Sequence, residues 1–183
     1  MNKHLIILGI AVLLICVGLS GCLKPEINVQ ELELEIHNLI NEERRKNGLS
    51  ELEYDYNLAT IARGHSKDMA KRFYFSHYSP EGDGPTERAI KANYPAYKDY
   101  GTYYTEGIAE NICQDNMLDS GYDICFIPLN DWNDKSELAN SIVDSWMNSY
   151  GHRQNILDSS YDKEGIGVAF AIGNDVYVTQ DFW

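Results

Sequence analysis

Three residues stand outside the regular hydrophobic pattern of the chain and carry side chains that bind metals or move protons. They are His77 in "FSHYSP", Glu110 in "AENI" and His152 in "YGHRQNIL", each just beyond an expected regular element. Two neutral imidazoles and one carboxylate make an open three-ligand site that leaves a fourth position on Zn²⁺ for water. The spacing alone also fits surface or helix-capping histidines.

The segment "SWMNSYGHRQNIL" is expected to set His152 at the end of a helix. This helix should begin near Ser136. Glycine is a common helix stop, because it adopts the left-handed conformation without a Cβ penalty. We therefore predict that the helix ends at Gly151 and that His152 turns into a cleft. The expected helix has apolar residues at helical spacing: Leu138, Ile142 and Trp146.

Two further helices are predicted nearer the N-terminus. The first runs from Val29 to the Asn-Gly pair at 47–48, and the second covers about 57 to 72. His65 falls on the apolar stripe of the second helix. We interpret it as a packed, hydrogen-bonded core histidine.

The end of the chain, "GIGVAFAIGNDVYVTQDFW", is β-branched and aromatic around a Gly-Asn-Asp turn, which predicts a terminal β-hairpin. "GIAENIC" predicts a short strand carrying Glu110, and a helical turn should start at Thr86. The tyrosine-rich residues 94–107 are predicted to be irregular. Glu164 is interpreted as a charge at a strand edge. Helices first and antiparallel strands last indicate an α+β fold with helices covering a sheet.

The N-terminus predicts export. An apolar run over residues 5–19, too short to span a bilayer, favours a secretory signal. It ends in Leu-Ser-Gly-Cys, which resembles the lipobox of prokaryotic lipoproteins with Cys22 as the lipidated residue. We predict a signal peptide over 1–21, a tether over 22–29 and one domain over 30–183. The alternative is an ordinary signal peptide and a secreted protein.

The net charge argues against two kinds of partner. The chain has 15 basic and 28 acidic residues, a formal charge of −13. This balance argues against nucleic acid and against electrostatic docking onto anionic lipid. We expect a monomer on the extracytoplasmic face of the membrane.

Two cysteines remain in the expected domain, Cys113 and Cys125. In an extracytoplasmic setting, a pair close in sequence predicts one disulfide closing a short loop. Two buried free thiols are the alternative.

Four blocks in order, "ARGHSKDMAKRFYFSHYSPEG", "AENI", "SWMNSYGHRQNIL" and "EGIGVAFAIGNDVYVTQDF", resemble the CAP superfamily. This superfamily unites cysteine-rich secretory proteins, antigen 5 and pathogenesis-related 1, and its members are also called SCP-like. The sequence is most similar to the prokaryotic secreted branch, over about 30 to 183. The resemblance implies a three-layer α-β-α sandwich.

The resemblance also implies a cleft with two histidines and two acids. His77 and His152 match the histidines, which implies that they hold a divalent metal, commonly zinc, and Glu110 matches the first acid. At the second acidic position this chain has Ser149, which puts acid/base catalysis in doubt.

Two main functions follow. The first is a binding or interaction module whose cleft takes a divalent cation and a lipid, peptide or glycan. The second is a zinc-assisted hydrolase in which His77 and His152 hold the metal and Glu110 takes a proton from water. A structural envelope protein with a vestigial cleft is a third interpretation.

Overall fold

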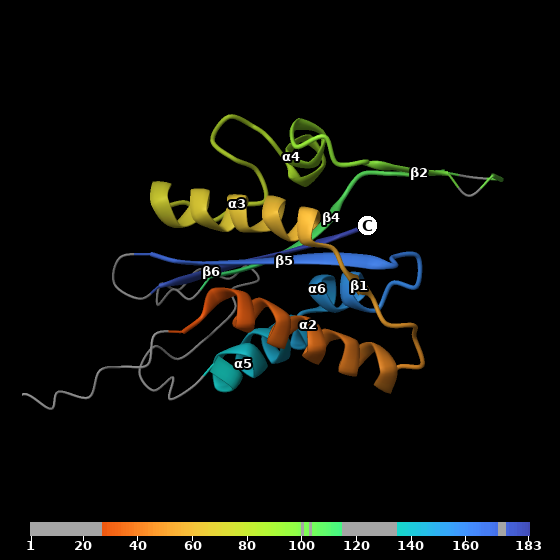
Figure 1. Ribbon diagram of the computed structural model, residues 1–183, viewed down its shortest axis with the longest axis horizontal. Coiled ribbons are helices and arrows are strands. Elements are labelled where there is room, and N and C mark those ends of the chain that lie inside the picture. The colour runs from red at the N-terminus through yellow and green to blue at the C-terminus, as the bar shows by residue number, and fades with distance from the viewer. Residues whose placement is uncertain (1–26, 100, 103, 115–134, 172–174) are drawn as a thin grey trace, which may run out of the picture.

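The computed structural model describes residues 27–99, 101–102, 104–114, 135–171 and 175–183, and these form three layers. A central sheet has helices α3 and α4 over one face and helices α2, α5 and α6 over the other (Figure 1). The predicted α-β-α sandwich is therefore confirmed. Residues 1–26 lie outside the described part, so the signal peptide and Cys22 stay predictions.

The sheet has the strand order β1-β5-β6-β4. Strands β5 (Lys163–Phe170) and β6 (Val176–Phe182) pair antiparallel, which confirms the terminal hairpin; its turn residues 172–174 lie outside the described part. Strand β4 (Ala109–Gln114) pairs antiparallel with β6, and the short β1 (Glu53–Tyr54) pairs parallel with β5.

Helix α2 (Val29–Lys46) confirms the first predicted helix. The side chain of Asn28 accepts hydrogen bonds from the first-turn amides of Gln30 and Glu31, and so caps the helix. The chain leaves the helix through Gly48, whose φ of +74° is the left-handed conformation expected after a helix end.

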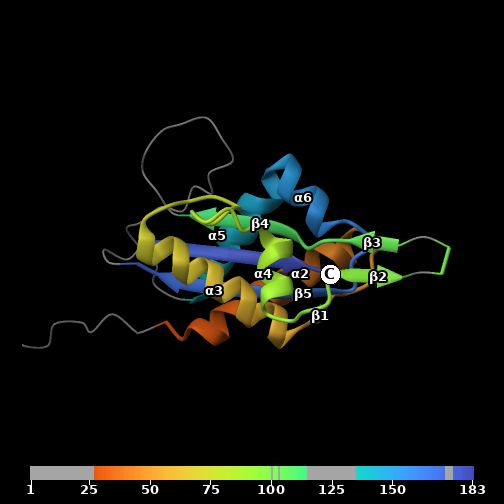
Figure 2. The ribbon, with the colours of Figure 1, turned by 90° about the horizontal axis from the view of Figure 1, so that it is seen from above.

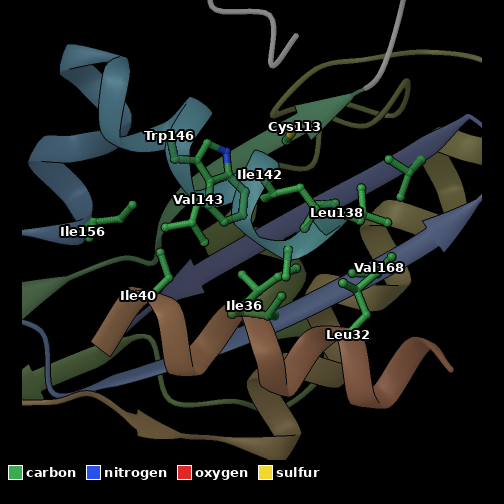
Figure 3. Close-up of a cluster of buried hydrophobic side chains, with 14 of the residues drawn as sticks. Leu32, Ile36, Ile40, Cys113, Leu138, Ile142, Val143, Trp146, Ile156 and Val168 are labelled. Carbon is green, nitrogen blue, oxygen red and sulfur yellow. The ribbon is translucent and has the colours of Figure 1, made fainter. Parts of the chain in front are cut away.

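The apolar face of α2 packs on α5 (Lys135–Asn148) and the sheet to form the main core. Trp146 lies at the centre of this core (Figure 3), and its indole N–H donates to the carbonyl of Ile112 on β4 at 3.3 Å. The largest contributors are fully buried: Leu32, Ile36, Ile40, Leu138, Ile142, Trp146 and Ile156.

Helix α3 (Tyr56–Arg72) covers the other face of the sheet and confirms the second predicted helix. It approaches β5 at two glycines. A Cβ on Gly165 would lie 2.1 Å from the backbone nitrogen of Ala59, and a Cβ on Gly167 would lie 1.9 Å from that of Arg63. These two glycines let the helix backbone rest directly on the strand.

The predicted helix end at Gly151 is wrong. Helix α5 ends at Asn148, Ser149 adopts an extended conformation, and a new helix, α6 (Tyr150–Ile156), begins at once. Gly151 and His152 therefore lie inside α6. A contact from α6 supports the break, because the guanidinium of Arg153 donates to the carbonyl of Met147 at 2.8 Å.

The segment over 94–107 was predicted to be irregular. It contains a small antiparallel pair of strands instead. Strands β2 (Tyr97–Asp99) and β3 (Tyr104–Glu106) form a hairpin that projects from the sandwich (Figure 2). The rings of Tyr97 and Tyr104 lie side by side, with centroids 5.3 Å apart. Cross-strand aromatic pairing of this kind stabilises a two-stranded ribbon.

Helix α4 (Pro85–Lys91) confirms the helical turn predicted at Thr86. Glu87 accepts a hydrogen bond from the backbone N–H of Gly84 and so closes the start of the helix. Along the described parts of the chain, none of the helices has both the length and the apolar character needed to cross a membrane.

Candidate functional site

Glu110 is the centre of a polar cluster beneath α3 and α4. It lies on β4 and is 7% exposed. One carboxylate oxygen, Oε1, lies 2.7 Å from Nδ1 of His77, and the other, Oε2, accepts from the guanidinium of Arg88. The structure therefore brings His77 and Glu110 together, as the sequence predicted.

His77 is placed by the loop that leaves α3. The helix ends where Phe73 adopts a left-handed conformation, with φ of 56°, and the chain then turns toward α4. Arg88 of α4 fixes the loop, because its guanidinium donates to the carbonyls of His77 at 2.9 Å and Asp83 at 3.0 Å.

The His77 side chain is 45% exposed. Because the carboxylate of Glu110 is bound to Nδ1, this nitrogen carries the ring proton in the neutral form and Nε2 keeps its lone pair for a ligand.

His152 lies on α6 and is 9% exposed. Its carbonyl accepts a hydrogen bond from the side chain of Asn111, the residue after Glu110, at 3.1 Å. Asn155, also on α6, donates to the carbonyl of Glu110 at 3.3 Å and to the Asn111 side chain at 2.8 Å. These contacts fasten the helix that carries His152 to the strand that carries Glu110.

A three-ligand metal centre is not assembled in the described part of the chain, which contains no group of three or more His, Cys, Asp or Glu side chains that could hold a metal ion. Glu110 is already engaged by His77 and Arg88. The metal prediction thus rests on the two histidines alone and stays a prediction.

Asp181 is a member of the cluster that the sequence analysis missed. It faces Glu110 across the β4–β6 ladder and is fully buried. Neither of its oxygens has a hydrogen-bond partner among the described residues. Burial, followed by the adjacent charge of Glu110, raises the pKa of Asp181 well above its usual range. The available signal was the one acidic residue in the final strand, Val176–Phe182, in which apolar and β-branched residues predominate.

His65 is a buried core histidine, as predicted, and its Nε2 lies 3.0 Å from the carbonyl of Ser76. It is also part of the cluster, because Nε2 lies 4.0 Å from Oε2 of Glu110. Burial lowers the pKa of His65, so the imidazole is neutral near pH 7.

Buried polar atoms without a partner concentrate around Glu110. Within the described residues these atoms are Nδ1 of His65, Nε of Arg88, both carboxyl oxygens of Asp181, and Nε1 of Trp183. All except the last belong to the cluster. Unsatisfied buried groups are rare in folded proteins, and perturbed titratable groups gather at functional sites. An open pocket of about 450 Å³ between α3 and α4 borders the cluster; His65 and Arg88 are among its lining residues, whereas His77 and Glu110 are not.

Glu164 was predicted to be a charge at a strand edge, and this prediction is wrong. It is fully buried on β5, where its carboxylate lies 2.5 Å from Nδ1 of His37 and accepts from Gln180 at 2.6 Å. Gln180 in turn accepts from Asn111 at 3.0 Å. This network ties α2, the sheet and, through Asn155, α6 together, so Glu164 has a structural part in positioning the site.

The comparisons with known proteins agree with this geometry. The model of the CAP family, described as the cysteine-rich secretory protein family, matches residues 37–182. The chain belongs to the CAP family. The described part of its CAP domain places the matched His77 and Glu110 in contact, and has Ser149 at the start of α6 where a second acid was expected.

The CAP domain is 31% identical over 141 residues to the uncharacterized protein YkwD of Bacillus subtilis. The aligned region covers 76% of this chain and 43% of YkwD. The chain therefore spans less than half of that curated relative.

Two solved structures share the fold. An extracellular protein of Bacillus anthracis that contains an SCP domain superposes with a TM-score of 0.60 at 25% identity, covering 84% of this chain and 40% of that one. An outer surface protein of Borrelia burgdorferi superposes with a TM-score of 0.63 at 19% identity, covering 85% of this chain and 94% of that one.

Proposed function

We propose that this CAP protein is an extracytoplasmic binding module, anchored through a lipid on Cys22, whose cleft presents His77 to a ligand and takes a divalent cation with the help of His152. The similarity to an extracellular protein of Bacillus anthracis supports the location. The apolar N-terminal run and its Leu-Ser-Gly-Cys ending support the anchor.

The contact between His77 and Glu110 is the observation that carries the binding function. Metal-binding histidines usually donate their second ring N–H to a carboxylate, which fixes the tautomer and makes the ligating nitrogen more basic. Glu110 holds Nδ1 of His77 at 2.7 Å, while the His77 side chain is 45% exposed. This arrangement prepares Nε2 of His77 to bind a ligand.

The donor set fits a weak, open site for a borderline metal such as zinc. Imidazole nitrogens suit Zn²⁺, and His77 and His152 would supply two of them. A bound Zn²⁺ would act as a Lewis acid toward a carbonyl or phosphoryl oxygen. The side chains of His77 and His152 would orient the ligand.

Binding is favoured over hydrolysis because both oxygens of Glu110 are engaged. A general base must be able to accept a proton from water. Glu110 instead faces the N–H of His77 and the cation of Arg88. The open pocket of about 450 Å³ beside the cluster offers room for part of a small lipid, peptide or glycan.

Calorimetric titration of Zn²⁺ into the chain from residue 23 onward tests the proposal. One binding event should be lost in both His77→Ala and His152→Ala. The matched control is Tyr78→Ala, which removes the exposed neighbour of His77 and should leave binding unchanged. Binding that survives both histidine substitutions would refute the metal site. Metal-dependent cleavage that disappears in Glu110→Gln would instead favour the hydrolase.

We further propose that Cys113 and Cys125 form the disulfide expected from the sequence. Cys125 lies outside the described residues, while Cys113 is fully buried on β4. Under denaturing conditions, alkylation without reductant should modify neither residue. Modification of both would favour the alternative of two thiols.

A further inference from the structure

Two carboxyl groups face each other across the sheet at the centre of the site. Glu110 of β4 and Asp181 of β6 are directly paired in the antiparallel register. Directly opposite residues project to the same face, with Cβ atoms about 4.5–5.5 Å apart. Glu110 is 7% exposed and Asp181 is fully buried. Two buried carboxyl groups this close do not both ionise, so the pair holds a proton at neutral pH.

The surroundings decide which residue carries that proton. One oxygen of the Glu110 carboxylate accepts from the guanidinium of Arg88 on α4 and the other lies 2.7 Å from Nδ1 of His77 in the loop, so both oxygens already face donors. Neither oxygen of Asp181 receives an N–H or O–H donor from the described residues. His65 on α3 lies 4.0 Å from the carboxylate of Glu110, and burial lowers its pKa. The proton therefore belongs to Asp181.

We propose that Asp181 is a positioning residue of the cleft, whose protonated carboxyl group donates a hydrogen bond to Glu110 and holds that carboxylate against His77. This inference deepens the proposed function and rests on it, because His77 is the residue that presents the ligand-binding nitrogen. It also gives the site a second carboxyl group, contributed by β6 rather than by the position that Ser149 occupies.

The arrangement explains why both oxygens of Asp181 lack a conventional donor. A carboxyl group that supplies its own proton needs an acceptor, and the carboxylate of Glu110 is that acceptor. An apolar residue in its place would take one hydrogen bond from Glu110 while leaving its carboxyl group buried. The contact with His77 would then weaken.

Infrared difference spectroscopy of the full-length protein, without added metal, tests the protonation directly. Wild type minus Asp181→Asn near neutral pH should show the carbonyl stretch of a protonated carboxyl group, shifted in D₂O. The matched control is Asp144→Asn on the exposed face of α5, whose difference spectrum should lack this carbonyl stretch. Loss of ionised bands in Asp181→Asn would overturn the proposal.

The positioning effect is tested by the NMR signals of the His77 ring nitrogens. Asp181→Asn keeps an N–H donor to Glu110 and should preserve the chemical shift of Nδ1. Asp181→Leu removes the donor and should shift that signal. If wild type binds zinc, Asp181→Leu should also weaken binding by about tenfold or more, while Asp181→Asn stays close to wild type.

The positioning role of Asp181 and the zinc site are refuted by different results. An unchanged His77 signal in Asp181→Leu would overturn the positioning effect. Absence of zinc binding in wild type would refute the metal site but leave the infrared result intact. If Asp181→Leu does not fold, the infrared comparison with Asp181→Asn still decides whether Asp181 carries the proton.

Discussion

The close approach of α3 to β5 predicts that Gly167→Ala destabilises the fold that carries the site. A Cβ at this position would lie 1.9 Å from the backbone nitrogen of Arg63 and 2.3 Å from the carbonyl carbon of Ala62, whereas ordinary contact begins near 3.4 Å. The helix would have to retreat by about 1.5 Å, the difference between 3.4 and 1.9 Å. Backbone atoms cannot rotate away as a flexible side chain would.

The energetic cost follows from that displacement. Overpacking in a core typically costs about 1–3 kcal/mol. The retreat would also stretch the 2.8 Å hydrogen bond from Ser66 Oγ to the carbonyl of Gly167, and a buried unsatisfied group costs about 1–3 kcal/mol more. Because domains of this size are stable by about 5–15 kcal/mol, a total of about 2–6 kcal/mol is a large share.

Urea denaturation followed by circular dichroism measures this effect. Gly64→Ala is the matched control, because Gly64 lies in α3, the helix that Gly167 contacts. A methyl group on Gly64 would meet no atom within 4 Å beyond the helix's own neighbouring backbone. It should leave stability unchanged or raise it by up to about 1 kcal/mol, since alanine favours helix. A Gly167→Ala midpoint equal to that of wild type would refute the direct backbone contact between α3 and β5.

Two further changes test the buried polar groups. Because burial lowers the pKa of His65, the unfolded state binds a proton that the folded state does not, so stability should fall as the pH drops below about 6.5, by up to about 1.4 kcal/mol per pH unit. Thermal melts should show that His65→Gln lacks this component; equal pH slopes in both proteins would contradict it. Glu164→Gln should cost about 1–3 kcal/mol, because its amide N–H₂ would face the N–H of either His37 or Gln180. A urea midpoint unchanged from wild type would show that the Glu164 charge is dispensable.

Local patterns were enough to predict α2, α3 and the terminal hairpin. The boundaries of α2 and α3 follow from apolar spacing and from the caps at Asn28 and Asp55, all of which act within one or two turns. The terminal hairpin follows from its β-branched composition. The end of α5 was mispredicted because the break depends on contacts between α5, α6 and β4, including that of Arg153 with Met147.

The sequence by itself determined the class of fold and, through the resemblance, two of the residues that are in contact at the site, His77 and Glu110. Only the tertiary structure decided the environment of Glu110. The register of β4 on β6 sets Asp181 opposite it, and the packing of α4 brings Arg88 to it. Such pairings join positions far apart in the chain, and the burial that perturbs Asp181 exists only once the layers have closed over the sheet.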